Sequence, residues 1–78
     1  MAGEETEAIT AQGLEELKAE LHHLETVGRR EMAAVILAAR EEGDLKENTE
    51  YHQAKEAQGL METKILRLQE RLRRAQVV

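Results

Sequence analysis

The sequence predicts an all-α fold, an antiparallel two-helix coiled-coil hairpin with an acidic tip loop. Two apolar stripes with helical spacing lie on either side of Gly43. The composition is typical of coiled helices, because the 78 residues include one tyrosine, no other aromatic residue and no proline. The two stripes also face each other in register if the chain folds back between them.

Residues 1–9 carry three glutamates and no periodic apolar pattern, so we expect a flexible lead before one hairpin domain, residues 10–78. Thr10 is a candidate N-cap. The first helix is predicted over about residues 10–42, where leucines recur at spacings of 3, 4 and 3 before the stripe continues less cleanly. Its members are Leu14, Leu17, Leu21, Leu24, Gly28, Met32, Val35 and Ala39.

Gly43 stands where the first helix should end, since glycine readily adopts the backbone conformation that often follows a helix. The tip is predicted at about residues 43–47, and the second helix over about residues 48–75. Its stripe alternates spacings of 3 and 4 and has one polar member, Gln58. The stripe consists of Tyr51, Ala54, Gln58, Met61, Ile65, Leu68, Leu72 and Ala75.

If the chain turns between Asp44 and Leu45, the two helices run antiparallel, and residues at equal distances from the turn face each other. A helix of about 30 residues is about 45 Å long, so the tip should lie that far from the two ends of the chain. The expected pairs are Leu14 with Ala75, Leu17 with Leu72, Leu21 with Leu68, Leu24 with Ile65, Gly28 with Met61, and Val35 with Ala54.

Three apolar residues, Ala33, Ile36 and Leu37, should turn toward other faces of the first helix. Three interpretations stay open for them. Another protein or a further domain covers them, the hairpin self-associates weakly through Leu37 and its neighbours, or they are single exposed apolar residues, which are common.

Length and charge exclude several functional classes. A chain of 78 residues forms at most one small domain, which argues against a pocket enzyme, and a net charge of −5 argues against a domain that grips a nucleic-acid backbone by itself. No apolar run approaches the roughly 20 residues that cross a bilayer, and cysteine is absent. We therefore expect a cytoplasmic protein with no membrane partner.

Two acidic residues of the tip, Asp44 and Glu47, have the spacing of a capping box, in which each side chain would bond the other residue's amide. The same two carboxylates could instead be ligands of Mg²⁺, which prefers oxygen donors and often takes one or two carboxylates plus water and substrate phosphates. Two carboxylates make no tight site alone, so a partner would have to supply the rest. Structural zinc at His22, His23 or His52 is disfavoured, because these residues lack a third ligand at helical spacing.

The segment GDLKENTEY, residues 43–51, resembles the tip motif of the bacterial Gre transcript cleavage factors, and of GreA-like members in particular. The resemblance extends over about residues 9–78, including REMAAVILAAREE and RLRRAQVV. It implies an amino-terminal coiled coil that enters the secondary channel of bacterial RNA polymerase. There, Asp44 and Glu47 would help the polymerase active site bind a shared Mg²⁺ and hydrolyse backtracked nascent RNA, so the chain would stimulate an enzyme and not be one.

The resemblance also implies contacts to the polymerase channel or the RNA 3′ end. A solvated helix face explains the basic residues equally well, Tyr51 fits a core position that closes the hairpin, and Asn48 fits an N-cap. The contact candidates are Arg40, Lys46, Asn48, Tyr51 and Lys55.

Two departures from the Gre pattern matter. Arg30 replaces a proline that is usual in the family, and nothing in the sequence corresponds to the second Gre domain, so we expect an excised amino-terminal domain. The alternatives are a Gre-like factor that plugs the polymerase channel and inhibits synthesis, and a coiled-coil interaction module without a chemical role.

Overall fold

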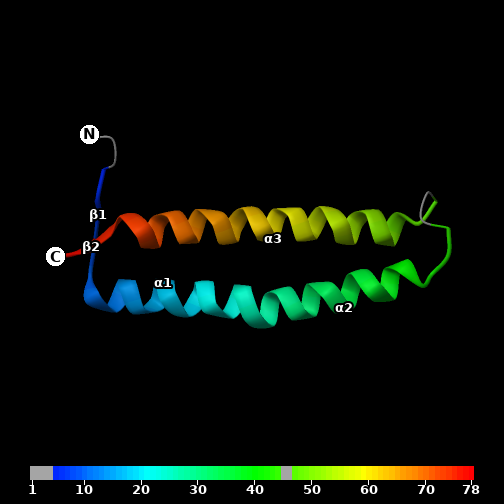
Figure 1. Ribbon diagram of the computed structural model, residues 1–78, viewed down its shortest axis with the longest axis horizontal. Helices are drawn as coiled ribbons and strands as arrows, with labels where there is room; N and C mark the ends of the chain where they lie inside the picture. The colour runs from blue at the N-terminus through cyan, green and yellow to red at the C-terminus, as the bar shows by residue number, and fades with distance from the viewer. Residues whose placement is uncertain (1–4, 45–46) are drawn as a thin grey trace.

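The computed structural model describes residues 5–44 and 47–78, which form a thin rod with extents of 52 × 27 × 13 Å. Helices α1 (Ala11–His23) and α2 (Arg29–Arg40) run along one side, joined by a π-helical turn, η1 (Leu24–Gly28). Helix α3 (Thr49–Arg74) returns along the other side (Figure 1). The predicted all-α hairpin is confirmed, and its helix limits agree with the prediction to within two residues.

A short parallel ribbon closes the end of the rod opposite the tip, which we call the base (Figure 1). Strand β1 (Glu7–Ile9) pairs with β2 (Ala75–Val77), and the amide of Val78 donates to the carbonyl of Ile9 at 3.1 Å. Residues 7–9, predicted as part of a flexible lead, therefore form a strand. The antiparallel helices bring the segments that flank them together at the base, where extended backbones can pair.

The core lies in the base half of the rod. It is made of aliphatic side chains from both arms of the hairpin, the first arm being α1, η1 and α2 and the second arm α3. Ile65 is fully buried, with a relative exposure of 0%. The buried cluster consists of Leu17, Leu21, Ile65 and Leu68, and the half-buried residues packed against it are Ile9, Leu24, Met61 and Leu72. This cluster confirms the predicted facing stripes in the base half of the rod.

Beyond η1 the predicted stripe is wrong at one position, Val35, while Met32 and Ala39 lie on the inner face as predicted. Val35, expected to face Ala54, is 53% exposed, whereas Ile36, expected to point elsewhere, is half-buried. A π-helical turn holds one more residue than an α-helical turn, which favours the later of the two adjacent positions, Ile36, on the inner face. Ala39 remains on the buried face, together with Ala54 from α3.

The π-helical turn η1 lies close to Arg30, the position at which the Gre family usually has a proline. Arg30 is the second residue of α2, two residues after the end of η1 at Gly28. Next to it, an added Cβ at Gly28 would lie 3.4 Å from Met61 Sδ, so the two arms approach closely at this level. The first arm is thus irregular at this level without a proline.

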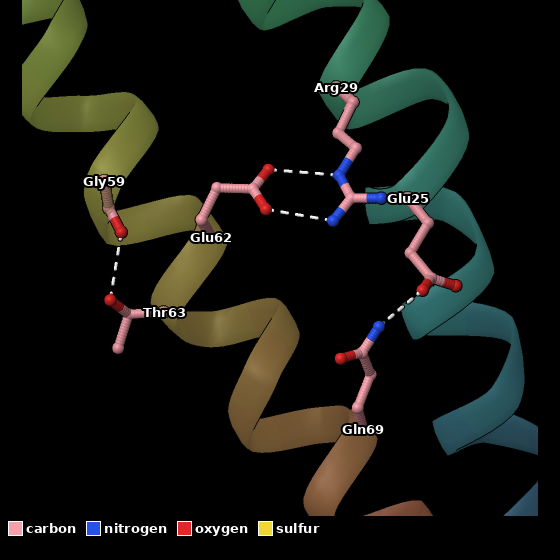
Figure 2. Close-up of polar contacts among 6 residues, drawn as sticks. All are labelled: Glu25, Arg29, Gly59, Glu62, Thr63 and Gln69. Atoms are coloured by element: carbon pink, nitrogen blue, oxygen red, sulfur yellow. Dashed lines mark hydrogen bonds and ion pairs between the residues drawn. The ribbon is translucent and has the colours of Figure 1, made fainter.

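Polar contacts connect the arms along their exposed edges. Arg29 donates two hydrogen bonds to Glu62, from Nε at 3.0 Å and from Nη2 at 2.9 Å, and Gln69 donates to Glu25 at 2.8 Å (Figure 2). Lys64 lies 3.3 Å from Glu20 on the same pair of arms. These contacts are largely solvated, so they fix the register more than they add stability.

The Arg29 contact predicts a pH dependence of stability. Its hydrogen bonds hold the pKa of Glu62 below the ordinary glutamate value, and the hydrogen bond from Arg73 does the same to the pKa of Glu70. The unfolded chain therefore binds protons more readily than the folded chain in acid. Stability should be complete above the ordinary glutamate pKa and decline as pH falls through the lowered folded values. Thermal melts between pH 7 and pH 3 measure this decline. Glu62→Gln should make the decline shallower. A variant that loses stability with pH as steeply as the unmodified chain would show that Glu62 does not contribute to the pH dependence.

Gly59 offers a stabilising substitution, because it lies inside α3 and an added Cβ would meet no atom within 4 Å. Alanine is about 1 kcal/mol more favourable than glycine inside a helix. Gly59→Ala should therefore raise the melting temperature by about 4–8 °C. The matched control is Gly43→Ala, which also meets no atom within 4 Å but has φ +135°, so it should lower the melting temperature. If both substitutions shifted the melting temperature equally and in the same direction, this explanation would be refuted.

Candidate functional site

The tip begins where the α-helical hydrogen bonds of the first arm end. The amide of Glu41 still donates four residues back, to Leu37 O at 3.3 Å, whereas the amide of Glu42 donates three residues back, to Ala39 O at 3.2 Å. Gly43 follows with φ +135°, a conformation that side chains with a Cβ rarely adopt. The positive φ predicted for Gly43 is confirmed, but α2 ends at Arg40, two residues before the predicted end at about residue 42.

Asn48 begins the second arm. Its Oδ1 accepts from the amide of Tyr51 at 3.0 Å, so the predicted N-cap at Asn48 is confirmed. The predicted capping box at Asp44 is wrong, because the helix begins four residues later than that pattern requires. The amide of Glu47 instead donates to the backbone carbonyl of Asp44 at 3.1 Å, which tightens the turn between the arms.

An open hollow of about 330 Å³ lies at the tip. It brings together the two predicted carboxylates, Asp44 and Glu47, both of which are exposed. The described residues that line it are Glu42, Asp44, Glu47, Asn48, Thr49 and Glu50. Glu42 and Glu50 join the hollow only because the turn closes, so spacing along the sequence did not single them out.

The donor set is one of carboxylate oxygens open to water, which suits a hard cation such as Mg²⁺. Within residues 5–44 and 47–78, no group of three or more His, Cys, Asp or Glu side chains is placed to hold a metal ion. Asp44 and Glu47 therefore fit part of a magnesium site and would need further ligands from a partner. The histidines His22 and His23 are exposed at the end of α1.

Comparison with known proteins agrees with this architecture. The family described as "Transcription elongation factor, N-terminal", which covers GreA and GreB, matches residues 7–77. The chain belongs to this family. GreA of Hamiltonella defensa, of Alkalilimnicola ehrlichii and of Legionella pneumophila are each 47% identical to it over 70 residues. The match covers 90% of the chain and 44% of each relative, so the chain spans less than half the length of these GreA proteins.

The remaining candidates of this GreA-type hairpin lie on both arms near the tip. Arg40 is exposed at the end of α2, and Lys55 Nζ donates to Gln58 Oε1 at 3.1 Å. Tyr51 is half-buried on the seam, with its ring edge-on to His52 at 5.5 Å between centroids. Lys46 lies outside the described residues. Contacts of these residues with polymerase or RNA remain predictions.

The helices of the GreA-type hairpin are amphipathic. In the part of the chain that the structure describes, no helix has the length and the apolar character that crossing a membrane would need.

Proposed function

We propose that this hairpin enters the secondary channel of bacterial RNA polymerase and stimulates Mg²⁺-dependent hydrolytic cleavage of backtracked nascent RNA at the polymerase active site. The observation that carries the proposal is the exposed pair of carboxylates, Asp44 and Glu47, in one hollow at the end of a rod 52 Å long. Membership of the elongation-factor family supports the same role.

The shape of the rod suits this role. Two helical arms packed side by side form its length (Figure 1), and the buried cluster around Ile65 lies in the base half, away from the tip. The base half can therefore hold the two arms together while the tip is placed inside another protein.

Asp44 and Glu47 would contribute oxygen ligands to an Mg²⁺ that is shared with the polymerase. A bound Mg²⁺ activates water and stabilises developing charge on phosphoryl oxygens. The hairpin would thus supply part of a metal site and its placement, while the polymerase would supply the remaining ligands, the RNA and the reaction itself. Arg40, Lys46, Tyr51 and Lys55 are the proposed contacts to the channel or the RNA 3′ end.

The test is transcript cleavage by purified bacterial RNA polymerase halted in a backtracked complex. Addition of the hairpin at saturating concentration should speed the shortening of the RNA in a manner that requires Mg²⁺. Slower nucleotide addition without faster cleavage would indicate a factor that plugs the channel. No effect on either reaction would indicate an interaction module and would contradict the proposal.

A further inference from the structure

Asn48 joins the two arms directly at the point where the tip begins and ends. Its Oδ1 accepts from the amide of Tyr51 in α3, while its Nδ2 donates to the carbonyl of Ala39 in α2. The second bond connects residues that are nine positions apart, across the whole tip. The side chain is partly buried, unlike the carboxylates beside it.

We infer that Asn48 is a positioning residue, which fixes the separation of the two arms and thereby holds Asp44 and Glu47 where a partner's metal site can use them. This inference rests on the proposed function, since it assigns a role in the placement of those carboxylates. It also gives Asn48 a role inside the hairpin, because both of its polar groups are bonded within the chain, while its contact with the channel or the RNA stays a prediction.

Few side chains can make both bonds. An N-cap needs a side-chain oxygen, which Asn, Asp, Ser and Thr all provide. The bond to Ala39 also needs a donor that reaches across to the other arm. Asparagine carries an acceptor and a donor on one planar group, an aspartate carries only acceptors, and a serine hydroxyl is a single short group.

The bond from Asn48 Nδ2 to Ala39 O, which we call the clasp, ties α2 directly to α3 beside the tip. The backbone bonds described between Arg40 and Thr49 are those of Glu41 and Glu42 to the last turn of α2, that of Glu47 to Asp44, and that of His52 to Asn48 within the second arm. None of these bonds ties α2 to α3. Without the bond from Asn48 to Ala39, apolar packing around the buried residues Ala39 and Ala54 would still hold the two arms together, but no directional bond of this side chain would fix their separation.

Two variants separate the clasp from the cap. Asn48→Asp keeps the cap oxygen but loses the donor, and Asn48→Ser keeps a cap oxygen without adding charge but is too short to cap and to reach Ala39 as well. With the halted polymerase, both should lower the cleavage rate at saturating hairpin by about tenfold or more, because a misplacement of about 1 Å can reduce a rate by about 100-fold. The hairpin concentration for half-maximal effect should change much less. Maximal rates equal to that of the unmodified chain would overturn the inference.

The matched control is the other confirmed N-cap, Thr10, at the base of the rod. Its Oγ1 accepts from the amide of Gly13 at 2.9 Å. Thr10→Ala should lower the melting temperature while leaving the maximal cleavage rate unchanged. If it lowered that rate as much as the Asn48 variants, general destabilisation would explain all three results and the positioning role would be refuted.

Hydrogen exchange in the free chain separates failure of this inference from failure of the proposed function. In Asn48→Asp and Asn48→Ser, the amides of Glu41 and Glu42 should exchange about fivefold faster, as expected when one ordinary hydrogen bond no longer opposes local opening. The amide of Tyr51 should remain protected in Asn48→Asp because the cap persists. Unchanged exchange at Glu41 and Glu42 would overturn the clasp whether or not the hairpin stimulates cleavage.

Discussion

Ile65→Ala should unfold much of the hairpin near physiological temperature. Ile65 is the one fully buried large side chain among the described residues and lies in the cluster with Leu17, Leu21 and Leu68. Truncation of a buried isoleucine to alanine costs about 2–5 kcal/mol. A domain of this size has about 4–12 kcal/mol of stability in total, at roughly 0.05–0.15 kcal/mol per residue. Circular dichroism should therefore show a fall of at least about 10 °C in melting temperature.

The adjacent residue provides the control for this prediction. Leu66 follows Ile65 in the same helix but is 64% exposed, so Leu66→Ala removes a side chain of the same size from a solvated face. Its melting temperature should lie within a few degrees of the unmodified value, since such surface changes are usually within about 0.5 kcal/mol. Similar losses in the two variants would mean that the described core does not stabilise the rod.

Asp44→Asn and Glu47→Gln should each remove most of the stimulated RNA cleavage while leaving the hairpin folded. Each substitution keeps the shape of the side chain and removes the charge that a cation would require. Because Asn48 caps α3, neither carboxylate is the N-cap, and the melting temperature should change little. Cleavage rates and thermal melts on the same preparations test both parts of the prediction.

Glu41→Gln is the matched control for the two tip substitutions. Glu41 is an exposed carboxylate of the same acidic segment, yet it does not line the tip hollow. The neutralised variant should retain cleavage stimulation. Equal losses from Glu41→Gln, Asp44→Asn and Glu47→Gln would indicate that the total negative charge of the segment matters and that no particular pair does.

The base half of the rod could be predicted from its leucines. Leu17, Leu21 and Leu68 are separated by polar residues, so only one helical phase buries them, and the structure has that phase. In the tip half, Val35, Ile36 and Leu37 are consecutive apolar residues, and the pattern alone does not decide which one faces α3. The π-helical turn before them decides it, and that turn changes the phase without a proline to mark it.

The ribbon at the base was missed for a different reason. Strands β1 and β2 have three residues each, too few to show an alternating pattern. Their pairing depends on the hairpin bringing together two segments that are distant in the sequence. Only the folded structure contains this information.

The candidate site could likewise be predicted only in part. Spacing and the Gre resemblance identified Asp44 and Glu47, and the cap preference identified one of the two bonds of Asn48. The bond from Asn48 to Ala39 follows from the closure of the hairpin and has no counterpart in local sequence patterns. The exposed side chains of Val35 and Leu37 leave weak self-association as a prediction that sedimentation can test.

The most direct test of the central claim is the cleavage rate of a backtracked polymerase complex with saturating Asp44→Asn/Glu47→Gln hairpin and Mg²⁺. The account predicts the rate of polymerase alone, with a competition assay showing that the double variant still displaces the unmodified hairpin. Cleavage as fast as with the unmodified hairpin would contradict the claim that these two carboxylates complete the polymerase's metal site.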